Sequence, residues 1–153
     1  MPTGFVNWWV ISGAEVVVTG SMKYDGATTD CANPRITALR GLFRIRPKDR
    51  VLVAGSTMAP EESIIIDTWR QLEPINPDLK LILVPRHPER FEEVAQLLER
   101  ENISFVHRSR LTGSEQSLPR VILVDTVVVA AVWGLADVGY VGGSLECRRG
   151  RRA

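Results

Sequence analysis

The strongest constraint on the fold of this chain is an alternation of short apolar runs with longer segments of helical periodicity. The clearest pair is Leu79–Val84 (LKLILV), followed by a helix predicted from Pro88 to Glu101. Near-continuous apolar strands are typical of a parallel sheet that is covered on both faces, and strand–helix alternation implies right-handed βαβ units. The pattern therefore predicts an α/β fold, namely a Rossmann-like parallel sheet with flanking helices.

The remaining elements follow from the same pattern. A helix is expected to begin at Asn33-Pro34, because a capping residue followed by proline at the first helical position favours a helix start. A second helix is predicted from Pro60 to Leu72. Further strands are predicted at Glu15–Thr19, Arg50–Ala54, Ser104–His107, Arg120–Val124 and Val138–Val141, with an apolar segment between Thr126 and Ala136.

Length and composition fit one globular domain rather than a membrane or nucleic-acid-binding chain. The 153 residues suffice for a single core, and 44% hydrophobic with 24% charged residues is ordinary for a soluble domain. The net charge of +1 provides no global field for nucleic acid, so no nucleic-acid partner is expected. No apolar run approaches the roughly 20 residues that span a bilayer, so no membrane segment is expected in this chain.

Three parts of the chain are expected to differ in character. Residues 1–13 form an irregular lead-in, residues 14–145 form the α/β domain, and residues 146–153 form a basic tail. Four arginines lie in the tail, which is expected to be solvated but could contact a phosphate. Cys31 and Cys147 have no metal-like spacing, and neither a metal nor another cofactor is expected.

The first candidate binding residues follow the strand that ends in LILV. In an open parallel sheet, ligands bind at the carboxyl ends of the strands, where helix N-termini favour anions. Arg86 and His87 lie there between two prolines, Pro85 and Pro88. An arginine supplies a bidentate phosphate donor, and the histidine supplies another. A turn that His87 caps, with Arg86 solvated, explains the pattern equally well.

Other candidates occupy the equivalent loops. Gly142, Gly143 and Ser144 follow a predicted strand, and glycines let a backbone approach a ligand closely, although a plain turn is the simpler interpretation. Ser56 and Thr57 end another strand, where capping is the ordinary role. The last candidate, Lys23, could reach a phosphate or carboxylate, although surface lysines in turns are common.

Signatures of self-sufficient catalysis are missing from the sequence. There is no nucleophile elbow, Walker motif, zinc motif or GxGxxG, and His87 and His107 lack the spacing of a metal pair. Glu61 and Glu62 occupy a predicted first helical turn, where the macrodipole favours acids, and no other role is indicated. No catalytic residue is therefore predicted.

Five stretches of the sequence, between roughly residues 14 and 145, form a recognisable series: VVVTGSMKYD (16–25), VLVAGSTMAPEES (51–63), LILVPRHPERFEEVAQLLE (81–99), VILVDT (121–126) and LADVGYVGGSL (135–145). In this order and spacing they resemble the C-terminal domain of the 3-deoxy-D-manno-octulosonic acid (Kdo) transferase family. These enzymes are glycosyltransferases of the two-domain GT-B type.

The resemblance implies transfer of Kdo from CMP-Kdo to a lipid A precursor in lipopolysaccharide biosynthesis, in the cytoplasm at the inner-membrane face. By the same resemblance, Arg86, His87, Gly142, Gly143, Ser144, Ser56, Thr57 and Lys23 would face the donor. The acceptor and the catalytic base would belong to an N-terminal domain that this sequence does not contain. That missing half, or a second copy of the chain, is then an expected partner.

Departures from the family pattern predict an incomplete enzyme. Met58-Ala59-Pro60 stands where the family has a histidine and a glycine, and Val127–Ala130 replaces a Met-Gly-Glu-Leu run. The chain is therefore expected to be a fragment that is inactive alone. Two alternatives remain open: a non-catalytic CMP-binding or structural relic module, and half of another GT-B enzyme such as a nucleotide-sugar epimerase.

Overall fold

A computed structural model describes residues 33–126 and 129–143, all within one compact unit, Cys31–Ala153. Its centre is a five-stranded sheet in the order β3-β4-β2-β1-β5. All of the strand pairings are parallel. The strands are β1 (Arg50–Thr57), β2 (Leu79–Pro85), β3 (Phe105–His107), β4 (Val121–Leu123) and β5 (Val138–Val141). The predicted α/β class and its parallel sheet are confirmed.

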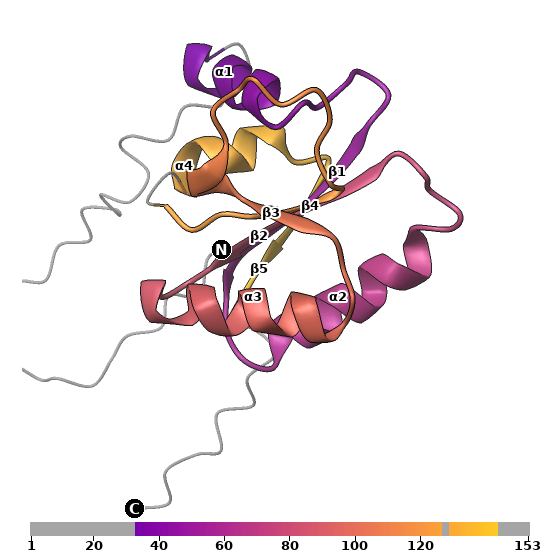
Figure 1. Cartoon of the computed structure of the whole chain (residues 1–153), viewed down its shortest axis with the longest axis vertical. Coiled ribbons are helices and arrows are strands. Elements are labelled where there is room, and N and C mark those ends of the chain that lie inside the picture. The colour runs from indigo at the N-terminus through magenta and orange to yellow at the C-terminus, as the bar shows by residue number, and fades with distance from the viewer. Residues whose placement is uncertain (1–32, 127–128, 144–153) are drawn as a thin grey trace, which may run out of the picture. The chain divides into compact units, whose positions relative to one another are not determined.

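Helices cover both faces of the sheet (Figure 1). One face carries α2 (Glu61–Leu72) and α3 (Phe91–Arg100), and the other carries α1 (Pro34–Leu42) and α4 (Val129–Val132). Short 3-10 turns complete the set: η2 (Pro88–Arg90), η3 (Arg108–Arg110) and η4 (Trp133–Leu135). Among the described residues, none of these helices is long and apolar enough to cross a membrane.

Two hydrophobic cores explain why the β2 sequence is apolar throughout. Successive strand side chains point to opposite faces, so Leu81 and Leu83 pack with α2 and α3, while Ile82 and Val84 pack with α1 and the segment after β4. Every residue of β2 is buried. This central position between β1 and β4 accounts for a strand that lacks the polar alternation of a half-exposed sheet.

Local signals place most element boundaries. The side chain of Asn33 accepts a hydrogen bond from the Arg35 backbone N–H (2.9 Å), which confirms the predicted cap of α1. The helix predicted from Pro88 divides in two: Pro88 opens the 3-10 turn η2, and α3 begins only at Phe91. The helix predicted from Pro60 begins at Glu61. The lead-in at 1–13, the strand predicted at Glu15–Thr19 and the basic tail at 146–153 lie outside the described residues.

Replacing Ile82 by alanine should strongly destabilise the domain. Ile82 is fully buried on the central strand, and truncating such a side chain costs about 2–5 kcal/mol because a cavity remains. Ile75, which is 75% exposed, gives a matched control, and Ile75→Ala should change stability by less than about 0.5 kcal/mol. Urea unfolding followed by circular dichroism measures both. Equal losses for the two variants would contradict the assigned core.

Candidate functional site

The loops that follow β1, β2 and β5 meet at the carboxyl edge of the sheet. The Arg86 backbone N–H donates to the Thr57 carbonyl oxygen (3.0 Å), joining the β2 loop to the end of β1. The Gly142 N–H donates to the Gly55 carbonyl oxygen (2.8 Å), joining the β5 loop to the same strand. Six of the eight predicted site residues therefore lie together at this edge: Ser56 and Thr57 end β1, and the other four lie in the loops that follow β2 and β5. Lys23 and Ser144 lie outside the described residues.

Arg86 and His87 are exposed at this edge, as an anion-binding turn requires. A Cβ atom built on Gly143 would lie 3.6 Å from Arg86 Nη1, so the guanidinium lies beside the β5 loop. His87 precedes η2 and makes no side-chain capping bond, so the capping alternative for this histidine is not observed. Its nearest carboxylate is that of Glu89, whose Oε1 is 4.0 Å from His87 Nδ1.

Gly142 allows the β5 loop to lie against the β1 loop. A Cβ at this position would lie 2.3 Å from the Ser56 carbonyl oxygen and 2.6 Å from Glu61 Oε2. These distances are far below normal contact, so only glycine fits here. Gly143 has φ +87°, a left-handed conformation that also favours glycine. The close approach at Gly142 is to the protein's own loop, and the predicted approach of this pair to a ligand stays a prediction.

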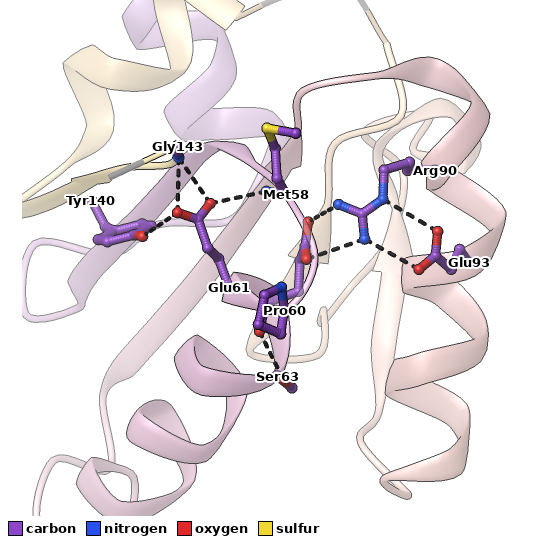
Figure 2. Close-up of polar contacts among 9 residues, drawn as sticks. Met58, Pro60, Glu61, Ser63, Arg90, Glu93, Tyr140 and Gly143 are labelled. Carbon is purple, nitrogen blue, oxygen red and sulfur yellow. Dashed lines mark hydrogen bonds and ion pairs between the residues drawn. The ribbon is translucent and has the colours of Figure 1, made fainter. Parts of the chain in front are cut away.

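Glu61 connects the loops from beneath (Figure 2). This residue is 1% exposed. Its carboxylate accepts hydrogen bonds from the Tyr140 hydroxyl (2.8 Å), the Gly143 N–H (2.8 and 3.0 Å) and the Met58 N–H (3.0 Å). From the sequence, Glu61 is expected only to interact favourably with the helix dipole. Its position four residues after the end of a buried strand, where backbone N–H groups converge, is the feature that could have indicated a larger role.

Glu62 holds the neighbouring loop by a different contact. Its buried carboxylate accepts two hydrogen bonds from Arg90, from Nη1 (2.8 Å) and Nη2 (3.2 Å), and Arg90 also pairs with Glu93. Figure 2 shows the Arg90 guanidinium facing the carboxylate of Glu93. The two arginines of the PRHPER segment thus have different surroundings. Arg90 is fixed between α2 and α3, whereas Arg86 is exposed at the carboxyl edge.

Ser56 and Thr57 contribute through their backbones. Ser56 has φ +56°, and its carbonyl oxygen is the atom closest to Gly142. The Thr57 side chain is fully buried, and its hydroxyl has no hydrogen-bond partner among the described residues. The main-chain carbonyl of Thr57 instead anchors Arg86. Both residues therefore shape the loops in this structure.

A second polar cluster lies at the carboxyl ends of β3 and β4. Asp125 accepts hydrogen bonds from the Ser109 N–H (2.8 Å) and the Ser109 hydroxyl (2.5 Å), and its Oδ2 lies 3.1 Å from His107 Nδ1. Burial alone would raise the pKa of Asp125, but the hydrogen bonds from Ser109 and His107 outweigh it and hold the pKa below its ordinary value. Across the described residues, no group of three His, Cys, Asp or Glu side chains could hold a metal ion.

These observations define a class: a parallel α/β domain of the Rossmann-like type, with an exposed arginine and histidine among the loops at the carboxyl edge of its sheet. Comparison with known proteins identifies the family within this class. The chain is 40% identical over 130 residues to the 3-deoxy-D-manno-octulosonic acid transferase of Haemophilus influenzae and 32% identical over 131 residues to that of Bordetella pertussis. The matches cover 84% and 83% of this chain but 30% of each relative.

A solved structure matches the same region. The C-terminal CMP-Kdo binding domain of WaaA from Acinetobacter baumannii superposes with a TM-score of 0.60 and 31% identity, covering 72% of this chain and 57% of that one. No protein-family model matches. The chain belongs to the Kdo transferase family and corresponds to its C-terminal domain. It spans about 30% of the length of the curated relatives that it matches.

Replacing Gly142 by alanine should disrupt the junction of the β1 and β5 loops. The added methyl group would overlap the Ser56 carbonyl and the Glu61 carboxylate, and such overpacking costs about 1–3 kcal/mol. Gly41 in α1 is the matched control, because a Cβ there meets nothing within 4 Å and Gly41→Ala should stabilise the helix by up to about 1 kcal/mol. Thermal unfolding measures both. A harmless Gly142→Ala would show that the loops are not packed this closely.

The Asp125 cluster should make stability depend on pH. The pKa of Asp125 is lower in the folded chain than in the unfolded chain, where it is about 3.9, so its stabilisation is present above that value. It is lost as the pH falls through the folded pKa. Asp125→Asn should therefore cost about 1–3 kcal/mol at pH 7, and the gap should close in acid. Urea unfolding from pH 7 downward tests this, with the exposed Asp67→Asn as control; a gap that stays constant would contradict it.

Proposed function

We propose that this domain binds CMP-Kdo, the donor of its family's reaction, at the carboxyl edge of the sheet. The observation that carries the proposal is the exposed Arg86 guanidinium beside the Gly142-Gly143 loop, in a family whose solved C-terminal domain binds CMP-Kdo. A guanidinium matches the geometry of phosphate and carboxylate, and both groups occur in this donor. His87 offers a second donor one residue further along.

The hydrogen bonds within the protein indicate which groups of each loop remain available for a ligand. The N–H groups of Gly142 and Gly143 are already donated to Gly55 and Glu61, so the glycines supply close approach rather than free donors. Arg86 and His87 then make the charged contacts with the ligand. Lys23 and Ser144, the other two residues of the predicted set, lie outside the described residues, and their part in donor binding stays a prediction, as does a donor-binding domain over residues 14–145.

The reaction that this site would serve is transfer of Kdo from CMP-Kdo to a lipid A precursor, at the cytoplasmic face of the inner membrane. In an inverting displacement at the anomeric carbon, Arg86 would stabilise the charge on the departing CMP. The chain corresponds to the C-terminal domain of the family and spans about 30% of the length of the relatives that it matches. We therefore propose that the 153-residue chain binds the donor and that the acceptor and the base come from a further domain.

Binding of CMP should depend on Arg86. Loss of one charge-assisted contact to phosphate costs about 1.5–3 kcal/mol, so Arg86→Ala should weaken binding by at least about tenfold. The exposed Arg35 on α1 is a matched control, and Arg35→Ala should leave the affinity unchanged. Isothermal titration calorimetry measures both. The proposal fails if the unmodified chain binds no CMP, and it loses its key residue if Arg86→Ala binds normally.

The chain alone should transfer no Kdo. Incubation of the purified chain with CMP-Kdo and a lipid A precursor, followed by mass spectrometry of the lipid, should show no added Kdo. The experiment needs a full-length family enzyme as positive control, so that inactivity of the chain can be separated from a failed assay. Turnover by the chain would overturn the proposed division between donor binding and catalysis.

A further inference from the structure

A basic pocket lies at the amino edge of the sheet, where the strands begin, opposite the carboxyl edge that carries the candidate site. Its volume is about 620 Å³, within the range of small-molecule sites. Its walls come from the end of α1, the loop that leads into β1, the start of β2 and the segment before β4. Because all of the strands are parallel, this edge is far from the loops that carry Arg86 and Gly143.

The lining of this pocket carries an excess of positive charge. Five cationic side chains line it, from Arg40, Arg44, Arg46, Lys80 and Arg120. Only two carboxylates, those of Asp49 and Asp78, line the same space. The chain as a whole has a net charge of +1, so the excess is a local feature and not a general property of the surface.

Burial of the Lys80 ammonium group adds an unfavourable free energy to this excess of positive charge. The residue is 7% exposed, and its Nζ lies 4.0 Å from Asp49 Oδ2. That carboxylate is already held by Arg46, through Nη2 (2.7 Å) and Nε (2.9 Å) to Oδ1 and through the backbone N–H (2.8 Å) to Oδ2. Burial lowers the pKa of Lys80, against the opposing effect of Asp49. The two carboxylates of the pocket, Asp49 and Asp78, thus serve three cations, Arg46, Lys80 and Lys48.

Two further arginines form no ion pair with a carboxylate of the described residues. Arg44 donates to the carbonyl oxygens of Gly113 (2.6 Å) and Glu115 (3.0 Å), which are neutral acceptors that position the guanidinium. Arg40 makes no side-chain hydrogen bond or ion pair with the described part of the chain, and it is exposed. By contrast, Arg120 is partly neutralised by Glu73 (2.8 Å). The lining of the pocket therefore combines Arg40 and Arg44 with a buried lysine.

We propose that this pocket binds a small phosphorylated compound. Phosphate groups carry up to two negative charges and match the fork of a guanidinium, and the surplus of cations over carboxylates suits such a dianion. Ser117 and Gln116 offer neutral polar contacts, while Ile45 and Leu118 offer apolar wall for an organic body. The site is separate from the donor site, so this proposal does not depend on CMP-Kdo binding.

The test is a titration of the isotopically labelled full chain with pyrophosphate, followed by two-dimensional NMR of the backbone amides. Saturable shifts are expected at Gly41, Ser117 and Leu118. Arg40→Gln should weaken this binding by about tenfold, the loss typical of one charged contact. Lys80→Met should weaken it similarly, and thermal unfolding checks that both variants fold. Arg86→Ala should leave these shifts unchanged, which separates this pocket from any phosphate binding at the carboxyl edge.

Several results would overturn the proposal. One is the absence of saturable shifts at these amides up to about 10 mM pyrophosphate, a concentration that would detect even weak binding. Another is shifts confined to Gly142 and Gly143, since they would assign the phosphate to the donor site. A parallel sedimentation assay uses vesicles of phosphatidylglycerol. Binding to these vesicles, lost in Arg40→Gln and without any response to pyrophosphate, would show a lipid surface in place of a soluble ligand.

Discussion

The buried carboxylate of Glu61 governs the geometry of the carboxyl edge. A charge this deeply buried is tolerated only where hydrogen bonds replace its lost hydration. Glu61 obtains them from three places in the sequence: Met58 before α2, and Tyr140 and Gly143 around the end of β5. Satisfying the carboxylate therefore fixes the β5 loop against the β1 loop. The same requirement explains Gly142, because any side chain there would occupy the space between the two loops.

The two arginines of the PRHPER segment differ in which contacts hold their side chains. Arg90 forms ion pairs with Glu62 and Glu93, and these contacts hold the start of α3 against α2. Arg86, four residues earlier, remains at the surface with its backbone N–H fixed to Thr57. A flexible arginine loses conformational entropy when it binds a ligand, and a fixed backbone reduces part of that cost. Thr57 thus fixes the backbone at Arg86, and Arg90 anchors the turn that follows it to α2.

The sequence predicted the fold better than the site because the two depend on different kinds of information. Periodicity along the chain is local, so the strands at Leu79–Val84 and Val138–Val141 and the cap at Asn33 could be predicted directly. The predicted loops also meet, since parallel strands bring their carboxyl ends together. The role of Glu61 could not be predicted, because its partners lie 79 and 82 residues away. The basic pocket was missed for the same reason: its arginines are scattered between residues 40 and 120.

The position of β5 explains why side chains, rather than the sheet, must hold the Gly142-Gly143 loop. Within the described sheet β5 is an edge strand that pairs only with β1, over four residues, and Val138 and Val141 are largely exposed. Such a short edge pairing restrains a following loop poorly. The missing restraint comes from the Trp133 ring, which packs against Gly55 and Gly139, and from the Glu61 carboxylate. The Gly142-Gly143 loop beside Arg86 is therefore held in a defined geometry even though, within the described sheet, β5 is paired on one side only.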